Sequence, residues 1–333
     1  PFFANIIDDN QVEIVGTTQA IVDQEIQYAH EAGIDYWAFD WYEADYHNLG
    51  MARELYLSSE YKDLINWTLI LMPNSFDLDK NLTWLIERFK EDNFQKVLNG
   101  RPLLYLYNAQ VSDLAMVNRI KKETVEAGVP VPYFVAMGTD VKVADAADAI
   151  GADAISFYVT SATHGSPYAT LTDREWKRWE QYKASGHQVV PTVTTGWDKR
   201  PRHDHPVSWE GQSLPTEWTQ QATPEEIADH LQEAIDWNAA NRDSAIANTA
   251  LIYAWNENDE GGWIVPTLFE LQQHGAPLRL NAIEQVLKPA DSSLPRSDAI
   301  VRSVPYPILG QDLIIAEVPD GTTVQSFLDN LVP

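Results

Sequence analysis

The feature that most constrains the fold of this chain is a repeated alternation between short apolar runs and amphipathic segments. The runs are rich in Val, Ile, Phe, Tyr and Trp. They cover residues 34–41, 67–72, 102–107, 132–137, 154–159, 188–194 and 249–254. Continuous apolar strands of this kind are typical of a parallel sheet that is buried on both faces. The alternation therefore predicts an α/β fold.

The segments between the runs have the spacing and the end residues of helices. The i, i+3, i+4, i+7 spacing of one buried helix face is followed by Leu82, Leu85, Ile86 and Phe89. A helix is also predicted from Thr223, because Pro224 stands at its first position and Glu226 at its third. Helices of this length between apolar strands fit the connections of a parallel sheet.

Within the α/β class we favour a (β/α)8 TIM barrel over a doubly wound sheet. The 333 residues fit one barrel of about 250 residues with an appendage. Seven strands are counted, and no Gly-x-Gly-x-x-Gly turn follows any of them. The eighth strand is expected upstream of residue 1, with residues 1–7 as the other candidate. In the preferred arrangement, residues 2–7 and 12–15 pair as a small hairpin.

The pattern changes near Lys288, which suggests a division of the chain. Residues 1–288 are assigned to the barrel and 289–298, rich in Pro and Ser, to a linker. Residues 299–333 contain two β-like runs and the start of a short helix. A segment this short buries little core by itself. It is therefore expected to be a small C-terminal α+β appendage or a truncated module.

Charge and composition restrict the partners. The chain has 23 basic and 49 acidic residues and a formal net charge of −26, which repels the phosphates of nucleic acids. No apolar run reaches the 18 residues typical of a membrane span. There is no cysteine, which excludes disulfides, thiolate nucleophiles and Cys-ligated zinc. A neutral or weakly charged partner, such as a sugar, suits this surface.

Polar and aromatic residues gather where the predicted strands end. In a barrel, catalytic groups come from the C-terminal ends of the strands, which together form its mouth. Residues predicted to bind substrate there are Asp40, Trp41, Tyr42, His47, Tyr107, Asn108, Tyr158, Trp197, Asp198, Trp255, Asn256 and Trp263. Aromatic rings in such a mouth can stack on sugar faces. For Asp40, a structural role at the strand end is the alternative. For Asp198, pairing with Arg200 or Arg202 to order the loop is the alternative.

Two carboxylic acids follow the last strand. Residues 255–261 read Trp-Asn-Glu-Asn-Asp-Glu-Gly, so Glu257 and Glu260 lie three positions apart. Two carboxyl groups near one bond are what glycoside cleavage requires, and different surroundings can divide them into an acid and a base. The alternative is that one acid begins a helix and the other lies on the surface.

Other chemistries have weaker support. His203, Asp204 and His205 resemble metal ligands but lack a third His or Cys nearby, so a surface loop is predicted and no metal is expected. The chain contains no Gly-x-Ser-x-Gly elbow, no phosphate-binding glycine loop and no His-Glu-x-x-His. No cofactor is expected.

Three motifs in order resemble the glycoside hydrolase family 99-like group, which includes the WbsX-like proteins of polysaccharide gene clusters. They are residues 32–42, Gly196-Trp197-Asp198 and Trp255-Asn256-Glu257-x-x-Glu260-Gly261. The resemblance spans residues 2–288. It implies a (β/α)8 barrel that acts on α-linked, mannose-like sugars of a polysaccharide, often within the chain and with retention. It also implies a bacterial protein that is secreted, periplasmic or on the cell surface.

The resemblance implies a role for each acid. The carboxylate at Glu257 acts as base on the 2-hydroxyl of the sugar, whose oxygen attacks the anomeric carbon and forms a 1,2-anhydro intermediate. The acid at Glu260 protonates the leaving oxygen and then activates water. The residues next to the pair depart from the usual ones, with Asn258, Asp259, Gly262 and Trp263 in this chain.

Two other functions stay open. The first is a glycosyltransferase of polysaccharide biosynthesis, since some members of the group are described so. The chain has neither a glycine-rich nucleotide turn nor an Asp-x-Asp motif, which argues against it. The second is a catalytically inactive carbohydrate-binding protein, against which the presence of both acids argues. No oligomeric state is predicted.

Overall fold

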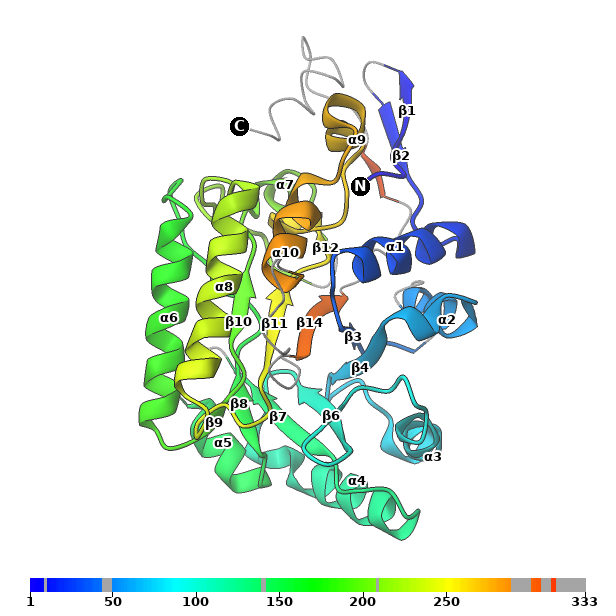
Figure 1. Cartoon of the computed structure of the whole chain (residues 1–333), viewed down its shortest axis with the longest axis vertical. Coiled ribbons are helices and arrows are strands. Elements are labelled where there is room, and N and C mark those ends of the chain that lie inside the picture. Colours follow the sequence, from blue (N-terminus) through cyan, green and yellow to red (C-terminus); the bar gives the residue numbers. More distant parts are fainter. Residues whose placement is uncertain are drawn as a thin grey trace.

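A computed structural model describes residues 1–8, 11–43, 50–138, 142–207, 210–288, 301–306 and 313–315. A sheet of parallel strands forms its centre (Figure 1). In spatial order the strands are β10 (Thr192–Thr194), β11 (Thr249–Tyr253), β14 (Val301–Tyr306), β3 (Tyr36–Asp40), β4 (Asn66–Leu71), β6 (Arg101–Leu106), β7 (Tyr133–Met137), β8 (Ala154–Ser156) and β9 (Gln188–Val189). The short β5 (Lys96–Val97) pairs antiparallel with β6.

The sheet closes into a barrel. Its two ends, β9 and β10, are separated in sequence only by Val190 and Pro191. The N–H of Val190 donates to Ile155 on β8 over 3.0 Å, and the carbonyl of Pro191 accepts from Leu251 on β11 over 2.8 Å. The segment 188–194 is therefore one broken strand that joins both neighbours. When β9 and β10 are counted as this one strand, the nine strands of the path become eight, as the predicted (β/α)8 barrel requires.

The eighth strand differs from expectation. β14 lies between β11 and β3, with Thr249 paired to Val301 and Tyr36 paired to Ser303. The prediction of a strand upstream of residue 1 is therefore wrong. The sequence predicts a β-like run here but places it in the appendage, because it follows the Pro- and Ser-rich residues 289–298. The predicted linker, 289–298, lies outside the described residues, so the domain division stays a prediction.

The N-terminal hairpin is confirmed. β1 (Asn5–Asp8) and β2 (Gln11–Ile14) pair antiparallel, and β15 (Leu313–Ile315) adds to β2. This small sheet stands apart from the barrel strands, above α1 (Gln19–Glu31) and beside α9 (Leu268–His274) in the view of Figure 1.

Helices surround the strands, with α6 and α8 on one side and α2 and α3 on the opposite side (Figure 1). Besides α1 and α9 they are α2 (Met51–Ser58), α3 (Leu78–Phe89), α4 (Leu114–Glu126), α5 (Val143–Ile150), α6 (Ala169–Ala184), α7 (Arg200–Asp204), α8 (Pro224–Ala240) and α10 (Leu278–Leu287). The predicted apolar face of α3 is buried. α8 begins with the predicted capping box, in which Thr223 Oγ1 accepts from the Glu226 N–H over 3.1 Å.

The inside of the barrel is packed. Tyr36, Tyr105 and Thr249 meet there, and the Tyr36 hydroxyl lies 2.8 Å from both Tyr105 Oη and Thr249 Oγ1. These buried hydroxyls hydrogen-bond to one another, as buried polar groups must. No helix among the described residues has the length and apolar character that crossing a membrane requires.

Candidate active site

The segment after β11 is built as a tight hairpin. β12 (Asn256–Glu257) pairs antiparallel with β13 (Gly262–Trp263), and a 3₁₀ turn, Asn258–Glu260, joins them. Gly261 closes the turn with φ of 76°, a conformation that residues with a Cβ rarely adopt. The hairpin brings both glutamates back to the same strand end.

Glycines let this hairpin touch the loop after β10. A Cβ on Gly196 would lie 2.2 Å from the carbonyl oxygen of Gly261, and one on Gly261 would lie 2.6 Å from Asp198 N. The Asp198 N–H donates to the Glu260 carbonyl over 2.6 Å. Two of the three sequence motifs therefore meet through backbone contact. This contact positions Glu260.

Glu260 is buried and surrounded by donors. Its carboxylate accepts from the Tyr253 hydroxyl and from Arg202, and Lys199 Nζ lies 3.2 Å away. Two cations and a hydroxyl therefore converge on this one carboxyl group.

Glu257 has a different environment. Burial raises the pKa of its carboxyl well above the usual value, and the charges of Glu260 and Asp259 raise it further. Arg202 Nη2 lies 3.0 Å from Glu257 Oε2 and acts in the opposite direction. The two glutamates thus lie in unlike surroundings, and their division into an acid and a base stays a prediction.

Arg202 joins the two acids, and sequence reasoning considered it only as a partner of Asp198. Its guanidinium also contacts Asp259, with Nε 2.8 Å from Oδ2, and Glu210, with Nη1 2.9 Å from Oε2. The basic residues after Trp197 mark this segment in the sequence. Pairing across 55 residues is a tertiary contact that the sequence alone does not reveal.

A third carboxyl group lies at the end of β3. Asp40 Oδ2 accepts from the Tyr158 hydroxyl over 2.7 Å, and in the described part of the chain its buried Oδ1 has no hydrogen-bond partner. Burial raises the pKa of Asp40 to about 7, the Tyr158 hydrogen bond lowers it, and the charge of Glu260 raises it. Asp40 and Glu260 therefore share one electrostatic environment.

Tyrosines connect these carboxyl groups. The Tyr158 ring contacts Tyr107 and Tyr253 edge to face, at centroid separations of 5.1 and 5.2 Å. Tyr158 binds Asp40 and Tyr253 binds Glu260. Tyr107 is 38% exposed and is the member of this row that solvent reaches most easily. The predicted residues Asp40, Tyr107 and Tyr158 are thus brought together with the glutamates.

The tryptophans require a correction. Trp41 is buried against Phe76 and beneath the guanidinium of Arg53, 4.3 Å from its ring. Trp255 is buried with its ring centroid 5.2 Å from that of Trp37. The prediction that these two rings contact a sugar is wrong, because residues next to a buried strand can continue its core packing.

The remaining aromatic predictions are mixed. Trp197 is also largely buried, with Lys199 Nζ 5.3 Å from its ring. Trp263 is partly exposed and carries the Arg279 guanidinium 3.5 Å from its ring. Tyr42 is partly exposed, and its carbonyl accepts from Arg53 over 2.9 Å.

Polar predictions divide similarly. Asp198 pairs with Arg200, Oδ2 to Nη2 over 2.6 Å, so the loop-ordering alternative describes its side chain. Asn108 is exposed and has φ of 47°, whereas Asn256 is buried in β12. His47 lies outside the described residues.

The histidine pair does not form a metal site in the structure. His203 Nδ1 lies 2.7 Å from the carbonyl oxygen of Ser213, and His205 is exposed. Across the described ranges, no three His, Asp or Glu side chains are grouped as metal ligands would be.

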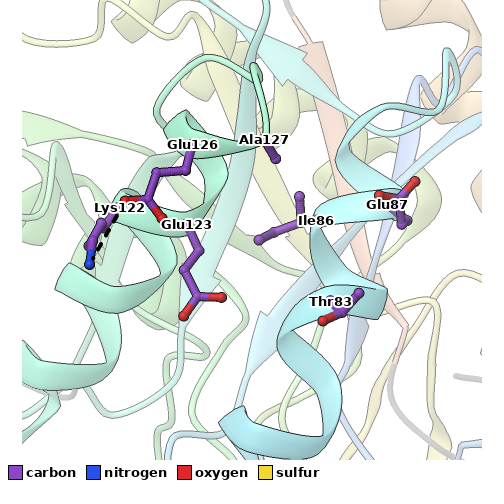
Figure 2. A pocket seen from close by; sticks show the side chains of 7 residues that line it. All are labelled: Thr83, Ile86, Glu87, Lys122, Glu123, Glu126 and Ala127. Atoms are coloured by element: carbon purple, nitrogen blue, oxygen red, sulfur yellow. Dashed lines mark ion pairs between the residues drawn. The ribbon is translucent and has the colours of Figure 1, made fainter.

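A groove on the outer surface lies between α3 and α4 (Figure 2). Its lining includes Ile86 and Glu87 from α3 and Lys122 and Glu126 from α4. These residues lie on the helices that cover the barrel. The groove is therefore separate from the glutamate pair at the strand ends.

Comparison with known proteins gives the family and the fold. The sequence model of the family described as "Glycosyltransferase WbsX" matches residues 68–273, more than half of the chain. No curated protein matches.

Two solved structures of a GH99 endo-α-mannosidase from Bacteroides thetaiotaomicron are similar. The structure in complex with bis-tris-propane has a TM-score of 0.53 at 16% identity and covers 76% of this chain and 75% of that one. The other has a TM-score of 0.52 at 16% identity, covering 76% and 71%. At 16% sequence identity, this structural similarity establishes the fold alone, which is the barrel predicted from the sequence. The match over residues 68–273 establishes more, namely that the chain belongs to the WbsX family, a GH99-like family.

Proposed function

We propose that this protein is a glycoside hydrolase that cleaves an α-linked, mannose-like bond in a polysaccharide with retention. The observation that carries the proposal is the pair of Glu257, which is half-buried, and Glu260, which is buried, joined by one guanidinium at the C-terminal end of the barrel strands. Paired carboxyl groups in unlike environments are suited to acid and base work on one glycosidic bond. The fold shared with endo-α-mannosidases supports the choice of sugar.

In the proposed reaction Glu257 is the base and Glu260 the acid. Glu257 takes the proton of the 2-hydroxyl, and the 2-oxygen displaces the leaving group at the anomeric carbon. Glu260 gives its proton to the leaving oxygen and then takes one from the water that opens the 1,2-anhydro sugar. The second inversion restores the configuration, and each glutamate returns to its starting state once the base passes its proton back.

This division sets a condition on the charges around the pair. Glu260 must carry a proton before the bond breaks, and its carboxyl group contacts Arg202 and Lys199. Glu257 must lose its proton, although burial opposes that loss. The loss of the Glu257 proton is eased if the guanidinium moves closer to Glu257, which it already contacts over 3.0 Å.

The row of tyrosines and Asp40 completes the proposed binding site. The buried Asp40 Oδ1 is placed to meet a sugar hydroxyl, and the exposed Tyr107 ring can stack on a sugar face. A carboxyl group with a pKa of about 7 can either donate or accept such a hydrogen bond near neutral pH.

The test is a substrate screen with product analysis. The purified protein is incubated with α-1,2-, α-1,3- and α-1,6-linked manno-oligosaccharides and with bacterial polysaccharides. Proton NMR of the first product then reports the anomer formed. We expect cleavage with retention, and loss of it in Glu257→Gln and Glu260→Gln. Undiminished cleavage by both variants would reject the proposed site.

A glycosyltransferase is the second candidate, because the matching family is described by that activity. Calorimetry with GDP-mannose and UDP-sugars separates the two. Micromolar binding of a nucleotide sugar, with sugar transfer to an oligosaccharide acceptor, would favour the transferase. Hydrolysis without any nucleotide favours the proposed hydrolase.

A further inference from the structure

Arg202 lies at the centre of the charged groups around the two glutamates. We propose that it is a positioning residue of the site, which couples Glu257 to Glu260 and sets the pH range in which they exchange protons. The consequence for catalysis rests on the proposed function, whereas the coupling itself does not.

The guanidinium uses its donors on two sides. On the inner side, Nη1 contacts Glu260 and Nη2 lies 3.0 Å from Glu257. On the outer side, Nε and Nη2 lie 2.8 and 3.2 Å from the two oxygens of Asp259, and Nη1 lies 2.9 Å from Glu210. A guanidinium is a rigid planar fork, so the outer contacts fix its orientation towards the inner ones.

Burial makes this arrangement electrostatically strong. Arg202 is only 9% exposed, so water and salt screen its charge poorly. Burial lowers the pKa of the guanidinium, but Glu257, Glu260 and Asp259 raise it by more, and the net change is upward. Arg202 therefore stays a cation throughout the pH range in which carboxyl groups titrate.

Several other titratable groups face the pair and act with Arg202. Lys199 Nζ contacts Glu210 and lies 3.2 Å from Glu260, and Asp40 adds a negative charge from β3. The hydroxyls that face the carboxyl groups belong to Tyr107, Tyr158 and Tyr253. Glu257 lies in range of three other carboxyl groups, those of Glu260, Asp259 and Asp40, and a shared cation offsets the repulsion between Glu257 and Glu260. Within the described residues, Arg202 contacts both glutamates directly.

Loss of the guanidinium should raise the pKa values of both glutamates. An opposite charge at this distance changes the pKa of a carboxyl group by about 1–3. Both titrations should then move to higher pH in Arg202→Met, and the activity maximum should move with them. A residue that only stabilised the fold would lower the melting temperature without moving either titration.

The direct experiment follows the carboxyl carbons by NMR. Protein with ¹³C-labelled glutamate is titrated from pH 3 to pH 9, and Glu257→Gln and Glu260→Gln assign the two signals. We expect both midpoints to move upward by about one to three pH units in Arg202→Met. Identical midpoints in wild type and Arg202→Met would overturn the proposal.

Arg200→Met is the matched control. It removes the same charge from the same helix, but Arg200 pairs with Asp198 and stacks on Trp218 at 4.0 Å and contacts neither glutamate in the described structure. We expect midpoints within a few tenths of a pH unit of wild type. An equal movement in both variants would show that net charge, and not the bridge, is responsible, and would also overturn the proposal.

Arg202→Lys covers the case in which Arg202→Met does not fold. Lysine keeps the charge but presents a point cation that cannot reach both glutamates as a planar fork does. We expect the titration midpoints of Glu257 and Glu260 to rise by less than in Arg202→Met. The separation between the two midpoints should differ from that in wild type. Unchanged midpoints in a folded Arg202→Lys, judged by circular dichroism, would count against Arg202 as the coupling group.

The activity arm separates this proposal from the proposed function. With the manno-oligosaccharide that is cleaved fastest, the pH profile of kcat should move upward in Arg202→Met and stay in place in Arg200→Met. If the NMR midpoints move but no glycan is cleaved, the proposed function fails and the coupling stands. If cleavage occurs but the profile and the midpoints do not move, the coupling fails and the proposed function stands.

Discussion

At the scale of single residues, the site depends on how three carboxyl groups share one buried volume. Glu260 contacts cations, burial is the largest cause of the raised pKa of Glu257, and Asp40 accepts a hydrogen bond from Tyr158. The sequence predicts the presence of these acids. It does not predict Arg202 as their link, because the partners are 55 and 58 residues away.

The roles of the two glutamates can be separated by the leaving group. Glu260→Gln should lose about 10²–10⁴-fold in turnover of the natural glycan, as expected for a missing general acid. It should still release fluoride from a glycosyl fluoride of the same sugar, because fluoride leaves without protonation. Glu257→Gln should fail on both substrates. The reverse pattern, measured by fluoride electrode and product chromatography, would exchange the two roles.

Asp40 predicts a pH dependence of stability. Its pKa is raised from 3.8 to about 7 in the folded protein, so the folded state holds the proton more tightly than the unfolded state. The stabilising contribution of the protonated form is complete below about pH 4 and is lost as pH rises towards 7. The side chain of Asp40→Asn cannot ionise. Between pH 4 and pH 7 the free energy of unfolding of this variant should therefore rise relative to that of wild type, by on the order of 2–4 kcal/mol.

Urea unfolding of both proteins at pH 4, 5.5 and 7 checks this. The quantity of interest is the difference in free energy of unfolding between wild type and Asp40→Asn, in which the other carboxyl groups largely cancel. A difference that does not change with pH would show that Asp40 titrates normally.

At the scale of elements, the site is made by two loops that touch through glycine. The hairpin of β12 and β13 and the loop after β10 approach at Gly261 and Gly196. The sequence gives the motifs that contain these glycines. The reason that both positions need glycine becomes visible only in the structure. The Gly261 carbonyl would lie within 3 Å of a Cβ on Gly196, and the Asp198 amide within 3 Å of a Cβ on Gly261.

Gly261→Ala should therefore damage the site more than the fold. Its φ of 76° is unfavourable for alanine, and the added Cβ would lie 2.6 Å from Asp198 N. We expect a loss of about 1–3 kcal/mol in stability and a larger loss in turnover, because Glu260 is displaced. Gly275→Ala is the control, with φ of 66° and open space around the new Cβ. Its turnover should be unchanged, and equal turnover in both variants would contradict the proposed role of the contact.

At the scale of the whole molecule, the sequence predicts the barrel well because seven strands are apolar on both faces. β3, β7, β8 and β11 fall within their predicted runs, and β4 and β6 each begin one residue before theirs. Predictions failed where residues depend on distant partners. Trp41 and Trp255 lie at strand ends yet complete the core, and Val301–Tyr306 follows the predicted linker yet pairs with β11 and β3 in the barrel. Each failure involves packing or pairing between parts that are far apart in the sequence.

The position of β14 leads to the last prediction, which concerns where the barrel ends. If residues 1–288 formed a complete domain, as the sequence suggests, a chain ending at 288 would fold. The structure places β14 between β11 and β3, so this truncation would leave two parallel strands with unpaired edges.

A chain ending at 306 would keep the pairing and lose β15, which adds only to the small outer sheet. We expect cooperative thermal unfolding for 1–306 and aggregation or a non-cooperative transition for 1–288, measured by circular dichroism and light scattering. Aggregation of 1–288 is expected because open edges of a parallel sheet invite association and are rarely left uncovered. Equal, cooperative unfolding of the two chains would mean that β14 contributes little to the barrel.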